Sequence, residues 1–254
     1  MSRTYAVIGT DARQVWLASL LKAHKLSVIS RPTPDLFADV MILPVPSVTK
    51  DGMLAGTALP FPEFLRTLPQ GAELWGSGFS PFLGCAEEQQ LTLKDFTAFE
   101  AFAEDNARPT AEGAVQLAME ELPVTIRGSR FLVIGYGRIG KQLAALLAAM
   151  GGEVTVARQK GEASPFRTDI TGTYIYPLEE YHAIFNTVPM PVLNESQCLQ
   201  TAGDCLLIDL ASQPGGIAKT QTRRLIHALG LPAKTSPKTA AEIMLRILLN
   251  ETEE

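Results

Sequence analysis

The sequence is poor in the residues that build metal centres and disulfide frameworks. Its 254 residues include only three cysteines and three histidines. Cys85, Cys198 and Cys205 lack the close spacing that is typical of zinc ligands, and three cysteines cannot all pair with one another. We therefore expect free, mostly buried thiols in a reducing compartment, and no metal site.

An excess of positive charge and a long apolar run are also absent. The net charge of −5 gives no general attraction for nucleic acid or for an anionic membrane. The apolar run from Leu143 to Met150 is far shorter than the ~20 residues that a membrane span needs. A strand-like segment begins at Tyr5 and leaves no room for a signal peptide before it. We expect a cytoplasmic protein that binds neither nucleic acid nor membrane.

Two stretches of the chain have the pattern strand, glycine turn, helix, strand. The first runs from Tyr5 to Ile29 and the second from Phe131 to Val156. A duplication and independent use of one supersecondary structure both explain the similarity. Further short apolar segments followed by turns lie at residues 40–43, 73–75, 183–185 and 205–208. Their alternation with helical patterns predicts parallel sheets covered on both faces.

These patterns predict an α/β protein with two doubly wound parallel-sheet domains. We place an N-terminal α/β domain at residues 1–108, a connecting helix that begins at Pro109 at 109–127, and a Rossmann dinucleotide-binding domain at 128–236. Residues 237–254 are predicted to form a helix. Its apolar residues Ala240, Ile243, Met244, Ile247 and Leu248 make one stripe, which we expect to pack on the first domain.

The strongest motif is a glycine loop that directly follows a predicted strand and opens a predicted helix. It consists of Gly135, Tyr136, Gly137, Arg138, Ile139 and Gly140. The first glycine permits the tight turn, the second lets a pyrophosphate approach the backbone, and the third lets the helix pack closely on the strand. Free N–H groups at the start of the helix would then face the phosphates.

The end of the following strand selects the cofactor. An NAD site needs a carboxylate there for the adenosine ribose, whereas this strand ends in Arg158, followed by Gln159 and Lys160. Arg158 can pair with a 2′-phosphate and stack on adenine. The end of this strand therefore favours NADP over NAD as the cofactor.

Later strand ends of the same domain are expected to reach the nicotinamide half of the cofactor. The residues concerned are Asn186, Thr187, Val188 and Pro189 after one strand, and Asp209 and Ser212 after the next. The first domain differs at its own glycine turn, because Asp11 and Gln14 stand where the loop has Gly137 and Gly140. Asp11 would repel a phosphate, so we interpret the first domain as the substrate domain.

Several segments together resemble the family of the A subunit of dipicolinate synthase. They are residues 8–14, 42–45, 109–113, 133–140, 186–189, 208–216, 229–232 and 237–240. The resemblance implies formation of dipicolinate, pyridine-2,6-dicarboxylate, from a dihydro- or hydroxytetrahydrodipicolinate precursor, with NADP as hydride acceptor. It also implies a role in sporulation, a flavoprotein-like partner, which is the B subunit of dipicolinate synthase, and a homo- or hetero-oligomer.

A small dicarboxylate substrate needs cationic and hydroxyl partners. The candidates are Arg13 and Lys238, with Ser47 and Thr110 as further hydrogen-bond donors. For acid–base catalysis the candidates are Glu112, at the expected start of the connecting helix, and Asp11. Each has a plainer interpretation as a surface charge, a helix cap or a partner of the helix dipole.

Two other functions stay open. A 2-hydroxyacid dehydrogenase would have a similar architecture but usually needs a histidine base. His24 and His227 fall on helix-like stretches and His182 precedes a strand, so none is expected near residues 209–216. The third possibility is an assembly subunit that binds NADP without catalysis.

Overall fold

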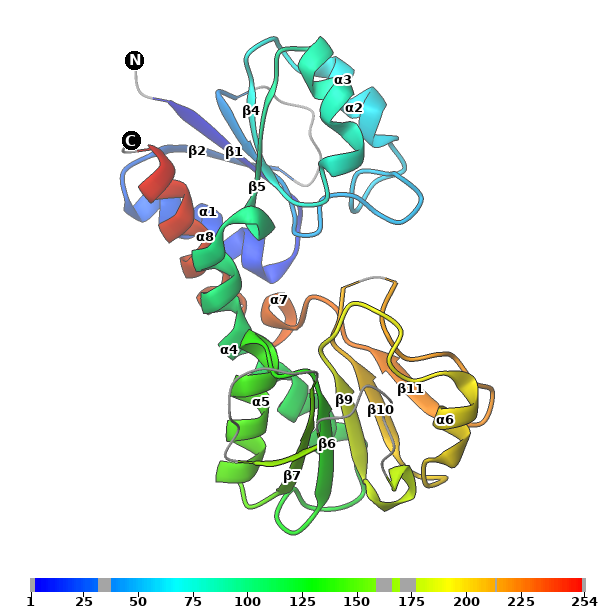
Figure 1. Cartoon of the computed structure of the whole chain (residues 1–254). Helices are drawn as coiled ribbons and strands as arrows, with labels where there is room; N and C mark the ends of the chain where they lie inside the picture. Colours follow the sequence, from blue (N-terminus) through cyan, green and yellow to red (C-terminus); the bar gives the residue numbers. More distant parts are fainter. Residues whose placement is uncertain (1–2, 32–37, 159–165, 170–176, 213, 253–254) are drawn as a thin grey trace. The chain divides into compact units, whose positions relative to one another are not determined.

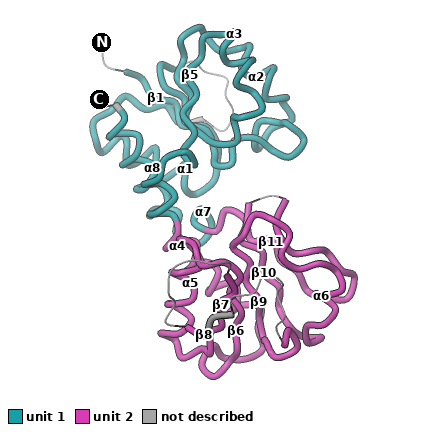
Figure 2. Tube along the Cα trace, viewed as in Figure 1, with its two compact units in different colours: residues 1–106, 232–254 teal, residues 107–231 magenta. Residues whose placement is uncertain are grey.

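The computed structural model describes residues 3–31, 38–158, 166–169, 177–212 and 214–252. The chain divides into two compact units, residues 1–106 with 232–254 and residues 107–231 (Figure 2). No helix within the described residues is long and apolar enough to cross a membrane.

The three cysteines are free, as expected. Burial raises the pKa of the Cys198 thiol and raises that of Cys205 to about 12.

Unit 1 is built on a five-stranded parallel sheet with the order β2-β1-β3-β4-β5 (Figure 1). This is the flavodoxin-like doubly wound order, in which the chain changes direction between β1 and β3. The strands are β1 (Thr4–Ile8), β2 (Ser27–Arg31), β3 (Val40–Ile42), β4 (Glu73–Gly76) and β5 (Thr92–Asp95). The helices are α1 (Ala12–Ala23), α2 (Phe61–Thr67), α3 (Leu83–Glu88) and α8 (Pro237–Thr252), with short 3₁₀ turns at Ser80–Phe82 and Phe96–Ala98.

Alternating side chains of the unit 1 strands supply two separate cores, one on each face of the sheet. Tyr5 and Val7 of β1 face a cluster that includes residues of α1 and α8, whereas Ala6 and Ile8 face a cluster with α2 and α3. Helix α8 lies beside α1 and carries a fully buried Leu248. The expected return of the C-terminal helix to the first sheet is therefore confirmed.

Unit 2 contains a six-stranded parallel sheet with the order β11-β10-β9-β6-β7-β8. This is the Rossmann order 3-2-1-4-5-6 read from the opposite edge, which confirms the predicted fold. The strands are β6 (Arg130–Ile134), β7 (Glu153–Ala157), β8 (Arg167–Asp169), β9 (Ala183–Asn186), β10 (Leu206–Asp209) and β11 (Arg224–His227). The helices are α5 (Arg138–Ala149) and α6 (Glu195–Gln200), with a 3₁₀ turn at Leu178–Glu180. Its two cores again take alternate residues, such as Phe131 and Leu132 of β6.

Two helices contain the points where the chain passes between the units. They are α4 (Glu100–Glu121) and α7 (Leu231–Thr235). The expectation that the connecting helix begins at Pro109 is wrong, because α4 starts nine residues earlier and Pro109 lies inside it. Proline is favoured at the first helical position, but the interior of a helix tolerates it at the loss of one N–H bond. The long helix supplies the packing that offsets this loss, with Ala107, Ala111, Ala114, Val115 and Ala118 buried.

The packing of α8 predicts a large loss of stability when one of its buried side chains is shortened. Leu248→Ala leaves a cavity at a fully buried position and is expected to lower the free energy of unfolding by about 2–5 kcal/mol. The measurement is urea denaturation followed by circular dichroism. Asn250→Ala, on the exposed side of the same helix, is the matched control and should change stability by less than about 0.5 kcal/mol. Equal stability of the two variants would show that α8 is not part of the unit 1 core.

Candidate dinucleotide site

The glycine loop begins with a close contact between the end of β6 and the start of α5. A Cβ on Gly140 would lie 2.2 Å from the backbone oxygen of Gly135, so α5 can approach the strand only with glycine at this position. Gly135 has φ +98°, a conformation that L side chains rarely adopt, and a Cβ there would lie 2.3 Å from Oγ1 of Thr187. Both glycines are therefore required by the fold of the loop itself.

Gly137 differs from these two glycines because a Cβ built on it meets nothing within 4 Å. It is the N-cap residue of α5 and no side chain caps the helix there. A helix start of this kind presents N–H groups without helical acceptors, which suits an anion such as a pyrophosphate. The open space and the uncapped helix start together fit the phosphates of a dinucleotide.

Arg158 follows β7 at the place where a Rossmann fold recognises the adenosine ribose. Its guanidinium carbon lies 6.0 Å from the centre of the Tyr136 ring. Its Nε atom is buried, and no described residue accepts a hydrogen bond from it. A buried donor without an acceptor is costly, and an acceptor atom supplied by a ligand would remove this cost. Gln159 and Lys160 lie outside the described residues.

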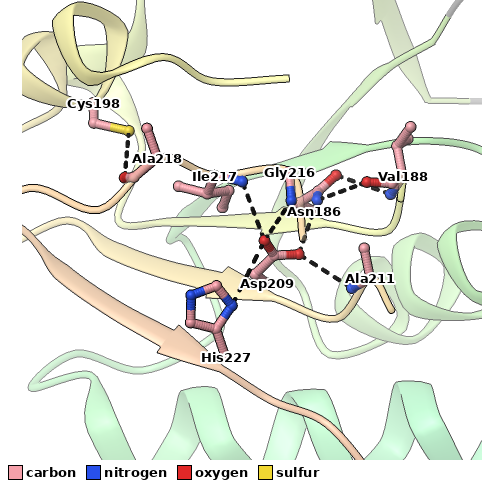
Figure 3. Close-up of polar contacts among 9 residues, drawn as sticks. All are labelled: Asn186, Val188, Cys198, Asp209, Ala211, Gly216, Ile217, Ala218 and His227. Carbon is pink, nitrogen blue, oxygen red and sulfur yellow. Dashed lines mark hydrogen bonds and ion pairs between the residues drawn. The ribbon is translucent and has the colours of Figure 1, made fainter. Parts of the chain in front are cut away.

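Two of the residues expected on the nicotinamide side, Asn186 and Asp209, belong to a buried hydrogen-bond network (Figure 3). Asn186 and Asp209, the last residues of β9 and β10, are opposite each other in the sheet and are both 0% exposed. The amide Nδ2 of Asn186 donates to Oδ1 of Asp209 at 2.9 Å and to the carbonyl of Val188 at 3.0 Å. Their side-chain atoms thus bind protein groups, which argues for an indirect role toward a cofactor.

Thr187 connects this network to the glycine loop. Its hydroxyl and its backbone N–H both donate to the carbonyl of Ile134, at 3.0 and 2.9 Å. Thr187 and Val188 are half-buried, whereas Pro189 and Ser212 are exposed. The expected cofactor residues of this half are therefore brought to one edge of the sheet.

His227 corrects the expectation that no histidine lies near residues 209–216. It belongs to strand β11 and not to a helix, and it is the register partner of Asp209. Its Nδ1 atom lies 3.9 Å from Oδ2 of Asp209. The segment Arg224–His227 is too short for its periodicity to distinguish a strand from a helix.

In unit 1 the corresponding turn is filled by side chains. Asp11 is the N-cap of α1 and accepts a hydrogen bond from the backbone N–H of Gln14 at 3.1 Å. Gln14 is buried and its Nε2 donates to the carbonyl of Ile8 at 2.9 Å. A carboxylate thus caps α1 where α5 is uncapped. This supports the expectation that unit 1 does not hold a second dinucleotide.

Arg13 and Ser47 lie at the carboxyl edge of the unit 1 sheet, where α/β proteins bind ligands. Nη2 of Arg13 donates to the carbonyl of Val45 at 2.7 Å and lies 3.8 Å from the Asp11 carboxylate. The buried Nε has no acceptor among the described residues. Burial lowers the pKa of the Arg13 guanidinium and Asp11 opposes this, but an arginine stays charged at neutral pH.

Ser47 is fully buried and its hydrogen bonds are internal. Its hydroxyl donates to the carbonyl of Pro44 at 2.6 Å and accepts from the backbone N–H of Ser77 at 2.9 Å. Gly76 leaves the room for it, since a Cβ there would lie 2.1 Å from this hydroxyl oxygen. Ser47 therefore joins the ends of β3 and β4, a role that its turn-like surroundings did not predict.

The remaining candidates lie on helices and not at strand ends. Thr110 and Glu112 are in the middle of α4, because this helix begins well before Pro109. Thr110 is buried, whereas the Glu112 side chain is 49% exposed and pairs with Arg108 at 3.2 Å. The burial on which a catalytic role for Glu112 depended is therefore absent. Lys238, in the first turn of α8, lies 5.6 Å from the centre of the Trp16 ring and 3.7 Å from Glu242.

Comparison with known proteins relates this geometry to a family. The chain is 29% identical to the A subunit of dipicolinate synthase from Bacillus subtilis (strain 168), covering 96% of this chain and 93% of that protein. The resemblance to this dipicolinate synthase subunit is confirmed. The crystal structure of the same subunit from Bacillus subtilis matches with a TM-score of 0.76 at 26% identity, over 100% of this chain and 98% of that one.

Two further matches agree with the fold. The crystal structure of the A subunit of dipicolinate synthase from Bacillus halodurans has a TM-score of 0.85 at 22% identity, over 99% of this chain and 98% of that one. Residues 101–191 match the NAD binding domain of D-isomer specific 2-hydroxyacid dehydrogenases. The fold of unit 2 and this match both support a nicotinamide-dinucleotide-binding domain.

The two kinds of glycine in the loop predict a contrast between variants. Gly137→Ala places its methyl group in open space, so the melting temperature should stay unchanged while dinucleotide affinity falls about tenfold or more. Gly140→Ala forces α5 away from Gly135 and should cost about 1–3 kcal/mol of stability as well. Calorimetric melting and fluorescence titration with NADPH measure the two effects. Unchanged NADPH affinity in Gly137→Ala would contradict phosphate binding at this helix start.

Proposed function

We propose that the chain is the NADP-dependent subunit of a cytoplasmic oxidoreductase that forms dipicolinate during sporulation, working in an oligomer with the flavoprotein-like B subunit of dipicolinate synthase. The observation that carries the cofactor assignment is the Arg158 guanidinium, which lies beside the Tyr136 ring and whose buried Nε has no acceptor among the residues that the structure describes. The support for the reaction is the resemblance to the A subunit of dipicolinate synthase, which extends over nearly the whole chain.

The proposed reaction converts a partly reduced ring into an aromatic pyridine. A dihydrodipicolinate loses a hydride from a ring carbon, which NADP⁺ accepts, and a proton, which a base or water accepts. A hydroxytetrahydrodipicolinate loses water in addition. Aromatisation drives the reaction, so the protein's main task is to orient the ring and its carboxylates.

Arg13 is the residue of unit 1 best suited to a substrate carboxylate. Its guanidinium is held in place by the Val45 carbonyl, yet the buried Nε still lacks an acceptor among the described residues. The planar donors of an arginine match the two oxygens of a carboxylate. The Asp11 carboxylate lies 3.8 Å from this guanidinium and is our candidate for the proton acceptor.

The cofactor assignment predicts a switch of preference on charge reversal. Arg158→Asp should weaken NADPH binding about 10- to 100-fold, since a charge-assisted hydrogen bond contributes about 1.5–3 kcal/mol. NADH binding should be unchanged or stronger, because the new carboxylate can accept from the ribose hydroxyls. Fluorescence titration with both coenzymes provides the measurement.

Arg127→Asp is the control for that variant, because it makes the same charge change at an exposed position before β6, at the opposite edge of the sheet. It should alter neither affinity. An unchanged ratio of NADPH to NADH affinity in Arg158→Asp would contradict the NADP assignment.

A 2-hydroxyacid dehydrogenase is a second candidate, favoured by one specific observation. His227 and Asp209 lie together at the carboxyl edge of the sheet, 3.9 Å apart, and a histidine oriented by a carboxylate is a common base for alcohol oxidation. The match of residues 101–191 to the 2-hydroxyacid dehydrogenase NAD binding domain agrees with it.

One assay separates these functions. The purified chain, with and without the flavoprotein-like partner, is mixed with NADP⁺ and either freshly generated hydroxytetrahydrodipicolinate or a panel of 2-hydroxy acids. We expect dipicolinate, seen by its ultraviolet spectrum, with an equal amount of NADPH. In the same assay, Arg13→Gln removes the guanidinium that we propose for a substrate carboxylate. It should therefore raise KM for hydroxytetrahydrodipicolinate more than it lowers kcat. NADPH formed only from a 2-hydroxy acid would favour the second candidate, and tight NADP binding with no product would indicate a non-catalytic assembly subunit.

A further inference from the structure

The carboxylate of Asp209 is fully buried and accepts four hydrogen bonds. Oδ1 accepts from Nδ2 of Asn186 at 2.9 Å and from the backbone N–H of Ala211 at 3.1 Å. Oδ2 accepts from the backbone N–H groups of Gly216 at 2.7 Å and Ile217 at 3.1 Å. One side chain thus fixes backbone on both sides of the turn that follows β10 (Figure 3).

Two glycines of this turn, Gly215 and Gly216, lie so close to the Asp209 network that neither position has room for a Cβ. Gly215 has φ +85°, and a Cβ on it would lie 2.6 Å from Oδ2 of Asp209. A Cβ on Gly216 would lie 2.5 Å from Nδ2 of Asn186 and 2.5 Å from the carbonyl of Met190. The carbonyl of Gly216 in turn accepts from the N–H groups of Val192 and Leu193. The turn after β10 and the segment after β9 are therefore held against each other.

Asn186 extends the network toward the glycine loop. Its Oδ1 accepts from the N–H of Val188 at 2.9 Å while its Nδ2 donates to the carbonyl of the same residue. Thr187, between them, is bound to the carbonyl of Ile134 and leaves no room for a Cβ on Gly135. A continuous series of contacts thus runs from the turn after β10 to the first glycine of the phosphate loop.

These segments lie in the second half of the Rossmann sheet. The first half, with Arg158 after β7, takes the adenosine side of a dinucleotide, and the second half takes the other nucleotide. We propose that Asp209 is a positioning residue: through Asn186 and the backbone of residues 211 and 215–217, it holds the strand ends of β9 and β10 in the shape that receives the nicotinamide half. This inference rests on the nicotinamide-dinucleotide binding of unit 2.

Asp209→Asn tests the proposal because an amide cannot satisfy the network in either orientation. Its NH₂ group must face either Asn186 and Ala211 or Gly216 and Ile217, and all of these are donors. We expect NADPH affinity to fall about tenfold or more, while affinity for 2′,5′-ADP, a probe of the adenosine side alone, stays within about twofold of wild type. Amide hydrogen exchange of Ala211, Gly216 and Ile217 should also become faster in the ligand-free protein.

Asp204→Asn is the matched control, an exposed carboxylate just before β10, and should change none of these measurements. If Asp209→Asn does not fold, Asn186→Ala removes one arm of the network, keeps the backbone bonds of Asp209, and should show the same selective loss to a smaller degree. A parallel loss of NADPH and 2′,5′-ADP affinity, or unchanged exchange of the three amides, would overturn the positioning role. Wild-type protein that binds neither NADPH nor NADH would instead overturn the cofactor function, while the exchange data would still report on the network.

Discussion

The dinucleotide site depends on the close approach of α5 to the end of β6. This approach exists because Gly140 has no side chain, since a Cβ would overlap the carbonyl oxygen of Gly135 at 2.2 Å. It fixes the direction of the helix and so places its uncapped N-terminus over the open space at Gly137. Thr187 packs against the same turn, because its Oγ1 would lie 2.3 Å from a Cβ on Gly135 and donates to the carbonyl of Ile134. The conformation of the phosphate loop and that of the segment after β9 therefore depend on each other.

The two units contain the same supersecondary structure with two different helix starts. In each, a first strand is followed by a glycine with positive φ, Gly9 or Gly135, and then by a twelve-residue helix, α1 or α5. In unit 2 no side chain caps the helix start, and its electropositive end suits phosphates. In unit 1 the Asp11 carboxylate caps the helix, and Gln14, at the position that corresponds to Gly140, donates to the carbonyl of Ile8. Arg13, next to this cap, is the cationic group that we propose for a substrate carboxylate.

Much of the fold could be predicted from the sequence because its signals are local. The apolar strands before Gly9 and Gly135, and the apolar stripe of α8, carry their own periodicity. The start of α4 could not be predicted in this way. Proline is typical of the first helical position, so Pro109 indicated a start there, and the residues before Glu100 lack a strong N-cap signal. His227 was missed because four residues are too few to define a period. The network around Asp209 depends on its bond to Asn186, 23 residues earlier, and the sequence marked these two residues as strand-end polar groups without showing that they bind each other.

The strand ends also explain why sequence reasoning grouped residues that have different roles. Polar residues gather at the carboxyl edge of a parallel sheet both to bind ligands and to join the loops that leave it. Whether a buried polar atom already has partners distinguishes the two roles. The oxygens of Asp209 each accept two hydrogen bonds from the protein, so this side chain is part of the scaffold. The buried Nε atoms of Arg13 and Arg158 have no acceptor among the described residues, and each such atom costs about 1–3 kcal/mol unless a ligand or water supplies one. An anionic ligand group at either arginine would remove this cost, which is the physical basis of the roles that we propose for the two side chains.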